Sequence, residues 1–308
     1  MAANGIVIRV VTHESQRAPE TVKNEALDFI HAMRPRLMGM HRNQCFIINM
    51  DQTPVFFDMT SGRTLETAGS RTVNGRTGTS STMRVTVAVT VTANGEMLKP
   101  MIIFKGKPGG RIQQREFPSY RNESIYACQD RAWMDEKVLQ EWVQKVLKPH
   151  AEKAPPGIHP ILLLDSYRCH LMSSVIDEIN ALGVQVEHIP GGCTGLCQPI
   201  DVGIGKPFKN RVRDRWGQWM MEQGVNTAMS HPPSRKTLSE RIIDSLNDIG
   251  PTIIRNSWRH GEYSYFPDDD PEEEIPNVLG ECGEIAATLP EQNAEGSIEG
   301  LGTEAVAI

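Results

Sequence analysis

The sequence has no long hydrophobic run. None of its 308 residues lies in a stretch that approaches the roughly 20 apolar residues a helix needs to cross a bilayer. The short apolar run near the N-terminus, "GIVIRVV", is interrupted by Arg9. No secretory signal peptide and no membrane partner are therefore predicted.

Cysteine is scarce and shows no spacing typical of a disulfide framework. The sequence has six cysteines: Cys45, Cys128, Cys169, Cys193, Cys197 and Cys282. This pattern predicts a reducing compartment. Cys193 and Cys197, with His170 and His188 nearby, leave a zinc site open as an alternative. Because the CxxxC pair has no second pair beside it, ordinary packing is the preferred interpretation.

Basic residues are missing from the C-terminal segment. Residues 262–308 contain 13 Asp or Glu and no Lys or Arg, so residues 1–261 hold all 32 basic residues against 25 acidic ones. The whole chain has a formal net charge of −6, but residues 1–261 alone have +7. A basic body suggests a polyanionic partner, with a solvated charged surface as the alternative. The acidic segment from about residue 267 is predicted to be disordered.

The first half of the sequence alternates between strand and turn signals. "CFIINMDQTP" predicts a buried strand that ends at Pro54. Two β-rich runs flank Asn94-Gly95, a dipeptide typical of a type I′ hairpin turn. Apolar residues at helical spacing predict a helix over residues 135–148, capped by Asp135 and followed by Pro149.

The second half predicts strands that alternate with helices. "HPILLLD" is typical of a central strand buried on both faces, and "VQVEHIP" predicts a further strand. Between and after them, helices are expected up to Gly183, through Phe208 and Val212, and over "TLSERIIDSLNDIG", with Thr237 as cap. This order predicts an α/β fold, a ribonuclease-H-like mixed sheet flanked by helices.

Three aspartates stand out by their positions. Asp51 is expected to end the first strand, Asp165 to end the fourth, and Asp201 to follow the fifth. Their carboxylates would then meet at one edge of the sheet, where a cation has to neutralise them. Oxygen ligands suit Mg²⁺ or Mn²⁺, and two ions about 4 Å apart could promote an in-line phosphodiester displacement. Taken singly, each aspartate could instead be an ordinary strand-end or cap residue.

Basic and aromatic residues follow Asp201. A helix that binds phosphates is predicted from four basic residues: Lys206, Lys209, Arg211 and Arg213. The alternative is that these residues only form charge pairs with Asp201. His170 is expected either beside the acids or in an ordinary structural role. Trp216 and Trp219 could stack on bases or could belong to a core face. Four arginines could follow a DNA backbone or could keep a loop solvated: Arg63, Arg71, Arg76 and Arg84.

Four segments carry a family resemblance: "NMDQTPVFFDM", "ILLLDSYRCHLM", "GCTGLCQPIDVGIGKPFKNRVR" and "IIRNSWRHGEY". They resemble the signature blocks of DDE-type transposases of the pogo/Tigger/jerky group in the Tc1/mariner superfamily, over about residues 5–265. The resemblance implies that Asp51, Asp165 and Asp201 form an acidic triad, with 35 residues between the second and third. It also implies Mg²⁺ or Mn²⁺, as two ions, a nuclear location, and a reaction that cuts DNA and joins its 3′-hydroxyl to a target.

The sequence departs from that family pattern in two places. "DSYRCH" stands where many relatives have Asp-Asn followed by a small residue or proline. Only about 44 residues precede the expected catalytic core, where relatives carry tandem helix-turn-helix domains. The expected organisation is therefore a linker remnant at 1–44, a catalytic domain at 45–266 and an acidic tail at 267–308.

Three functions are compatible with these observations. The first is a transposon-derived, metal-dependent DNA endonuclease and strand transferase. The second is a domesticated or decayed transposase that binds DNA or chromatin without cutting. The third, a hydrolase of RNA, rests on fold analogy alone. Assembly into a homo-oligomer is left open by the sequence.

Overall fold

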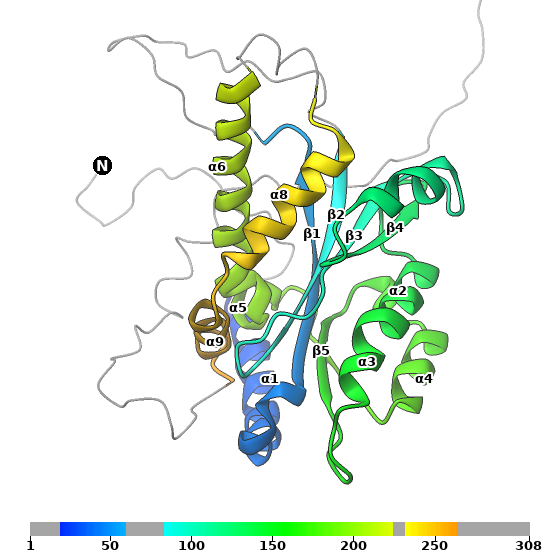
Figure 1. The fold of residues 1–308 in the computed structure, drawn as a ribbon. Helices are drawn as coiled ribbons and strands as arrows, with labels where there is room; N and C mark the ends of the chain where they lie inside the picture. The colour runs from blue at the N-terminus through cyan, green and yellow to red at the C-terminus, as the bar shows by residue number, and fades with distance from the viewer. Residues whose placement is uncertain (1–18, 60–82, 224–231, 264–308) are drawn as a thin grey trace, which may run out of the picture. The chain divides into compact units, whose positions relative to one another are not determined.

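A six-stranded mixed sheet organises the part of the chain that the structure, a computed structural model, describes: residues 19–59, 83–223 and 232–263. The strand order is β4-β3-β2-β1-β5-β6 (Figure 1). The strands are β1 (Ile47–Phe56), β2 (Arg84–Thr92), β3 (Met101–Lys105), β4 (Ile125–Gln129), β5 (Ile161–Asp165) and β6 (Gln185–Ile189).

Strand directions follow the expected mixture. β1 pairs with β2, and β2 with β3, in antiparallel fashion, whereas β1–β5, β5–β6 and β3–β4 are parallel pairs. The prediction of a ribonuclease-H-like mixed sheet flanked by helices is confirmed. Strand β4 was not predicted, because its sequence "IYACQ" is short and lies between segments with no clear turn signal.

Helices cover both faces of the sheet. In Figure 1, α2, α3 and α4 lie on one side, and α1, α5, α6, α8 and α9 lie on the other. None of the helices in the described ranges is long and apolar enough to cross a membrane. The α-helices are α1 (Pro19–Gly39), α2 (Glu136–Trp142), α3 (Lys148–Ala151), α4 (Ser173–Ala181), α5 (Thr194–Cys197), α6 (Gly205–Gln223), α8 (Arg235–Asn247) and α9 (Pro251–His260). Shorter turns are the 3-10 helices η1 (His41–Phe46), η3 (Phe117–Ser119) and η5 (Arg168–Leu171), and the π-helices η2 (Ile112–Glu116), η4 (Val143–Leu147) and η6 (Ile200–Ile204).

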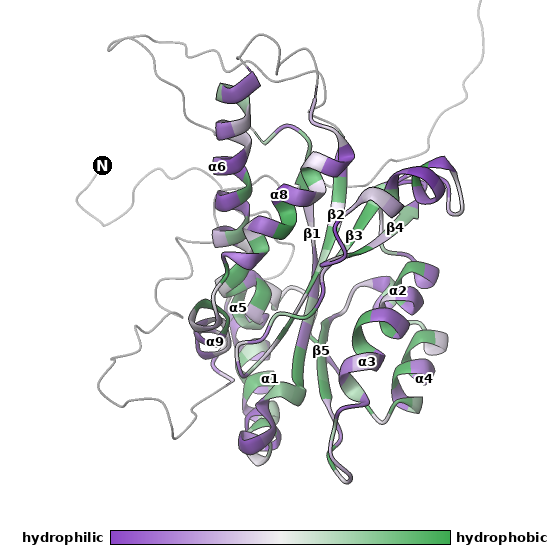
Figure 2. Ribbon diagram, viewed as in Figure 1, coloured by the Kyte–Doolittle hydropathy of each residue, from purple (hydrophilic) through white to green (hydrophobic). Residues whose placement is uncertain are grey.

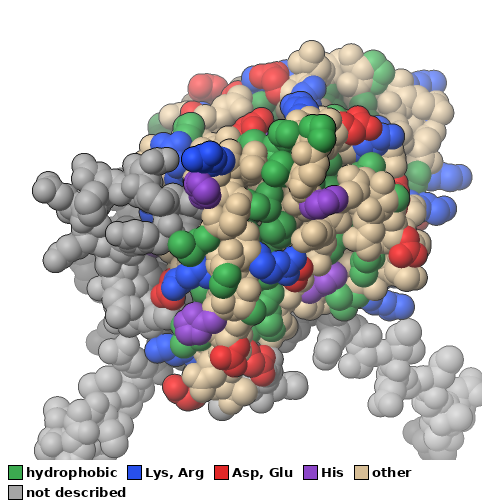
Figure 3. Space-filling model, turned by 90° about the horizontal axis from the view of Figure 1, so that it is seen from below, with side chains coloured by type: hydrophobic (Ala, Val, Ile, Leu, Met, Phe, Trp, Pro, Cys, Tyr) green, Lys and Arg blue, Asp and Glu red, His purple; other side chains and the backbone are tan. Residues whose placement is uncertain are grey.

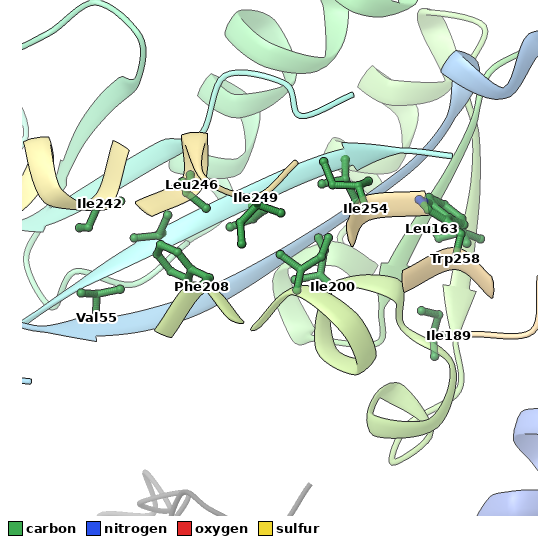
Figure 4. Close-up of a cluster of buried hydrophobic side chains, with 14 of the residues drawn as sticks. Val55, Leu163, Ile189, Ile200, Phe208, Ile242, Leu246, Ile249, Ile254 and Trp258 are labelled. Atoms are coloured by element: carbon green, nitrogen blue, oxygen red, sulfur yellow. The ribbon is translucent and has the colours of Figure 1, made fainter. Parts of the chain in front are cut away.

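Two hydrophobic clusters hold these layers together. The larger lies on the side of α1, α6, α8 and α9, and Figure 4 shows Val55 and Leu163 of the sheet near Phe208, Leu246 and Trp258 of the helices. The smaller lies between the sheet and α2–α4. In Figure 2 the strands are largely hydrophobic, whereas the helices also carry hydrophilic residues. Burial of both sheet faces explains why β5 has a continuous apolar run rather than an alternating one.

Helix α1 joins the larger cluster directly. Its side chains at helical spacing, Ala26, Ile30, Met33 and Leu37, are all buried there. The helix comes from the segment predicted as a linker remnant, and its described residues pack on the sheet. Beyond residue 263, the predicted tail lies outside the described residues.

Strand β1 does not end at Pro54, contrary to the prediction. It continues to Phe56, with Pro54 opposite Thr86 of β2. The parallel pairing of β1 with β5 extends only to Asn49, so β1 has a single neighbouring strand at Pro54. A proline without an N–H is tolerated at such an edge-like position.

The hairpin at Asn94-Gly95 is not a type I′ turn. Gly95 has a φ of +96°, but Asn94 is not in the left-handed region, which a type I′ turn requires of both residues. The N–H of Thr92 donates to the carbonyl of Glu96 at 2.9 Å and closes a three-residue loop. A Cβ at Gly95 would lie 2.8 Å from the carbonyl oxygen of Pro251, so the hairpin tip packs tightly against the start of α9.

The helix predicted over 135–148 extends beyond Pro149. Asp135 caps it as predicted, because its carboxylate accepts from the N–H of Val138 at 3.0 Å. Pro149 does not follow the end but lies inside α3, directly after the π-helical turn η4. Proline lacks the N–H for a regular helical bond and clashes with the carbonyl four residues earlier, and a wider turn before it relieves both problems.

The cap of α8 also differs from the prediction. Ser234, not Thr237, is the N-cap, and its hydroxyl accepts from the N–H of Thr237 at 3.0 Å. The helix therefore begins nearly one turn earlier than expected. Gly250 follows the end of α8 as predicted and is also the N-cap of α9.

Candidate functional site

A polar stripe interrupts the core face of β1. Asn49, Asp51 and Thr53 alternate along the strand between Ile47 and Val55, which belong to the larger cluster. All three polar residues are buried, with 0%, 9% and 7% of their surface exposed. Three successive polar positions on a core face are unfavourable unless each finds a partner. These three positions therefore mark a candidate functional site within the otherwise apolar core face of β1.

Asp51 and Asp165 occupy equivalent positions on parallel strands. The last residue pair between β1 and β5 is Asn49 with Leu163, and each aspartate lies two residues beyond it. Asp165 ends β5 as expected. Asp51 does not end β1, because the strand continues to Phe56. The prediction that Asp51 ends its strand is therefore wrong. The matched register nevertheless places Asp51 and Asp165 at one level of the sheet.

Asp201 reaches Asp51 from the π-helical turn η6. The two carboxyl groups hydrogen-bond to each other, and the Thr194 hydroxyl also bonds to Asp201. Tight packing holds η6 in place: a Cβ at Gly203 would lie 2.7 Å from Cα of Ser257 in α9. Only glycine allows this approach of η6 to α9.

The electrostatics of this pair are unfavourable without a cation. Burial raises the pKa of Asp51 well above its usual range, and the charges of Asp201 and Asp165 raise that pKa further. Burial of its carboxyl also raises the pKa of Asp201, although the residue retains an exposed surface. Hydrogen bonds from Asp51 and Thr194 and the charge of Lys209 oppose this rise. A hydrogen bond between two carboxyl groups requires a proton, which a bound cation would replace.

Asp165 forms a separate ion pair with His170. The carboxylate contacts ring Nδ1 of His170 and also accepts from the N–H of Tyr167 at 3.2 Å. His170 is 1% exposed, and its Nε2 lies 2.8 Å from the side-chain amide of Gln52. Burial alone would lower the pKa of His170, but hydrogen bonds to Asp165 and Cys169 raise it to about 10. The raised pKa favours the cationic form of the ring, which pairs with the Asp165 carboxylate.

The three predicted acids are thus near one another but not equivalent. Asp51 and Asp201 are in contact, and Asp165 acts on both electrostatically while it is paired with His170. Within the described residues, no three or more His, Cys, Asp or Glu side chains are arranged so that they could hold a metal ion. The chemistry of the donor set nevertheless suits a hard divalent cation, because all its donors are carboxylate oxygens.

Helix α6 carries the predicted phosphate-binding residues on two different faces. The spacing i, i+3, i+7 puts Lys206, Lys209 and Arg213 on one face, whereas Arg211 lies on another. Lys206 is exposed, and the charge of Lys209 acts on Asp201. Lys209 is therefore the residue of α6 whose charge acts on Asp201, as the charge-pairing alternative expected.

The arginines of α6 have local partners. The guanidinium of Arg211 donates to the carbonyl of Pro207 at 3.2 Å, and that of Arg213 donates to the side-chain oxygen of Asn210 at 2.9 Å. Both residues remain only partly buried. Seen from below, charges of both signs are mixed with hydrophobic side chains on the molecular surface (Figure 3). That face is not a continuous basic surface.

Other residues singled out in the sequence have mainly structural contacts. Trp216 packs against the larger cluster, and Trp219 lies 4.7 Å from the guanidinium of Arg241. The guanidinium of Arg84 lies 5.8 Å from the ring of Trp133. Three of the loop arginines lie outside the described residues: Arg63, Arg71 and Arg76.

The two cysteines considered for zinc lie in the core. Cys193 and Cys197 are each 0% exposed. Their thiols donate to backbone carbonyls, that of Val22 at 3.5 Å and that of Cys193 at 3.2 Å. Burial raises the pKa of Cys197 to about 12, so its thiol is protonated at neutral pH.

Sequence reasoning missed three residues around the acids: Asn49, Gln52 and Thr194. Asn49 could have been found, because it shares a strand face with Asp51 in the alternating pattern of "IINMDQT". Gln52 and Thr194 had no such signal, because their roles depend on the turns that carry His170 and Asp201.

Comparisons with known proteins place the chain in a family. A family model described as DDE superfamily endonuclease matches residues 82–258, more than half of the chain. "Pogo transposable element with KRAB domain" from Mus musculus is 28% identical over 258 residues, which cover 80% of this chain and 40% of that protein. The Homo sapiens protein of the same name is 27% identical over 241 residues, which cover 77% and 38%. The chain thus spans about two fifths of the length of these relatives.

Solved structures of a transposase are also similar. The crystal structure of the mariner Mos1 paired end complex with Mg has a TM-score of 0.47 at 16% identity, covering 85% of this chain and 66% of that chain. The Mos1 transposase catalytic domain with Raltegravir and Mn has a TM-score of 0.44 at 12% identity, covering 82% and 100%.

Proposed function

The chain belongs to the DDE superfamily endonucleases, and from that membership we propose that it cuts and joins phosphodiester bonds in DNA. It would act as a transposon-derived endonuclease and strand transferase in the nucleus. The observation that best supports this proposal is the contact between the Asp51 and Asp201 carboxyls, with Asp165 at the equivalent position on the neighbouring strand. A buried group of acids with raised pKa values is typical of a functional site.

The three aspartates would hold Mg²⁺ or Mn²⁺, as two ions. When bound, the ions supply activation of the attacking hydroxyl and stabilisation of the leaving oxygen. Once the proton between them is removed, the carboxylates of Asp51 and Asp201 would both be available as ligands. The ion pair with His170 fixes the direction of the Asp165 carboxylate.

DNA is the proposed partner, and the α6 face formed by Lys206, Lys209 and Arg213 would contact its phosphates. The face begins five residues after Asp201, so a backbone bound along α6 continues into the acidic site.

A nicking assay tests the proposal. Supercoiled plasmid is incubated with the full chain in Mg²⁺ and then in Mn²⁺, beside an Asp51→Ala variant and an EDTA control. Nicking that depends on both the metal and Asp51 is the expected result. DNA binding without nicking in either metal would overturn the catalytic proposal and favour the non-catalytic DNA- or chromatin-binding alternative.

A further inference from the structure

The side-chain amide of Asn49 bonds to two segments that are distant in sequence. Asn49 is 0% exposed on the core face of β1. Its amide nitrogen donates to the carbonyl of Leu163 in β5 at 3.0 Å. Its amide oxygen accepts from the N–H of Ile200 in η6 at 3.2 Å.

Each of these contacts lies beside one of the acids. Asn49 itself precedes Asp51 by two residues on the same strand face. Leu163 precedes Asp165 by two residues, and Ile200 is directly before Asp201. A single amide group therefore joins the three backbone segments that carry the three carboxylates.

We propose that Asn49 is a positioning residue that fixes η6, and with it Asp201, against the two strands that carry Asp51 and Asp165. This inference rests on the proposed function for its metal ligands. The β1–β5 pair is already held by ladder hydrogen bonds, so η6 is the segment that needs a connection. Ile200 is the first residue of η6, and an N–H there has no partner within the helix.

The chemistry of this position favours asparagine. The site needs one donor and one acceptor on a short, planar group, and both must point to fixed backbone atoms. An aspartate has no donor when ionised, a leucine has neither group, and a serine is too short to reach both partners.

A buried hydrogen bond on the opposite side provides a matched control. Thr90 of β2 is also 0% exposed, and its hydroxyl accepts from the indole N–H of Trp142 at 3.1 Å. Thr90→Val removes a buried hydrogen bond without touching η6 or an acid. Comparison of Asn49→Leu with Thr90→Val separates positioning from a general loss of stability.

The experiment uses the full chain and two readouts. Mn²⁺ affinity is measured by calorimetry, and amide hydrogen exchange of residues 200–204 is measured without metal. We expect Asn49→Leu to weaken Mn²⁺ binding by about 10-fold or more, as loss of a group that orients metal ligands does. Exchange of the Ile200 amide should quicken by a similar factor, because its acceptor is lost. Thr90→Val should change neither by more than about twofold, at a comparable loss of thermal stability.

Two outcomes would overturn one hypothesis or the other. Equal Mn²⁺ affinity and equal exchange in Asn49→Leu and Thr90→Val would overturn the positioning role. No Mn²⁺ binding by the parent would instead overturn the proposed function, and hydrogen exchange would still decide whether Asn49 fixes η6. If Asn49→Leu does not fold, Asn49→Ser is measured in its place, with the same expected direction and the same overturning result.

Discussion

The two sides of the sheet satisfy buried polar groups in opposite ways. On the side of α2–α4, the hydroxyl of Thr90 is paired with the indole of Trp142, and both are fully buried among apolar side chains. On the other side, the carboxyl groups of Asp51 and Asp201 face each other, and Asp201 raises the pKa of Asp51. The same strands thus stabilise the fold through one face and build a site with the other.

Buried polar atoms without a hydrogen-bond partner occur on both sides of the sheet, and Nδ1 of His150 in α3 is one on the side of α2–α4. Within the described residues, both amide atoms of Gln198 and the indole nitrogen of Trp258 are buried without a hydrogen-bond partner. Gln198 lies three residues before Asp201, and Trp258 belongs to the larger cluster. Natural proteins lose stability where function places charged or strained groups. The two sides differ in their acids: Asp51 and Asp201 lie on the side of α6 and α9, which the proposed function makes the functional side.

The largest expected effect comes from removing one charge on the functional side. Asp201→Asn should reduce Mg²⁺-dependent nicking by on the order of 10³-fold, because an amide is a poor ligand for a hard ion. DNA affinity without metal should be unchanged or slightly higher, since a negative charge near the phosphates is lost. Nicking rate and filter-binding affinity are the measurements.

Asp214→Asn is the control for that variant. Asp214 is an exposed acid on α6, so its loss should leave nicking within about twofold. If Asp201→Asn cuts DNA as well as Asp214→Asn does, Asp201 is only a charge partner of Lys209.

The next effect tests the structural side. Trp142→Phe should lower the free energy of unfolding by about 2 kcal/mol, because it removes a buried hydrogen bond and leaves a small cavity. Mn²⁺ affinity should stay within about twofold of the parent, since α2 carries no ligand. Urea denaturation and calorimetry are the measurements. A large loss of Mn²⁺ affinity would show that the two sides are not independent.

A smaller effect of opposite sign is expected at the centre of the site. Asp51→Asn should raise the free energy of unfolding without metal by about 1 kcal/mol, because the raised pKa of Asp51 means that its charge destabilises the fold. Mn²⁺ at 100 times its dissociation constant should stabilise the parent by about 2.7 kcal/mol and the variant far less. Thermal unfolding with and without EDTA measures both.

Asp177→Asn serves as the comparison for Asp51→Asn. Asp177 is exposed on α4, on the structural side, and its replacement should change stability by less than about 0.5 kcal/mol. A metal-free stability of Asp51→Asn below that of the parent would contradict the view that the acids repel one another.

The smallest effect concerns the two faces of α6. Arg213→Ala should weaken DNA binding a few-fold and reduce the slope of log affinity against log salt by about 0.9, the contribution of one phosphate contact. Arg211→Ala, on the other face, should leave that slope unchanged. Salt titrations of DNA affinity compare the two. Equal slopes for both variants would mean that α6 does not present one face to DNA.

Most of the fold was predictable because its signals are local. The continuous apolar run of β5 and the alternation in β1 indicate which strands are buried, and helical spacing identifies α2, α4 and α6. Pro149 misled because a π-helical turn can carry a helix through proline, and such a turn leaves no mark in the apolar spacing. Strand β4 was missed because five residues without flanking turn signals resemble a loop.

The site was predictable only as a set of positions. Matching strand ends drew attention to Asp51, Asp165 and Asp201, and register then explains why the first two lie level. A position of His170 beside the acids was one of two alternatives that the sequence left open. The choice between them depends on how the 3-10 turn η5 directs the ring back toward β5. The role of Asn49 could not be predicted either, because its hydrogen-bond partners are distant in sequence and are brought near it only by the fold.

The close approach of Gly203 to Ser257 sets a minimum length for any autonomous fragment of this protein. All three acids and the whole basic face of α6 are encoded before residue 224. A fragment ending there would contain every residue of the site but would lack the wall of α9 that η6 rests on. In such a fragment Asp201 would be present, but η6 would no longer be held in place by α9. The smallest fragment that keeps the site therefore has to include α9, which Gly203 contacts, and cannot end after the last proposed metal ligand.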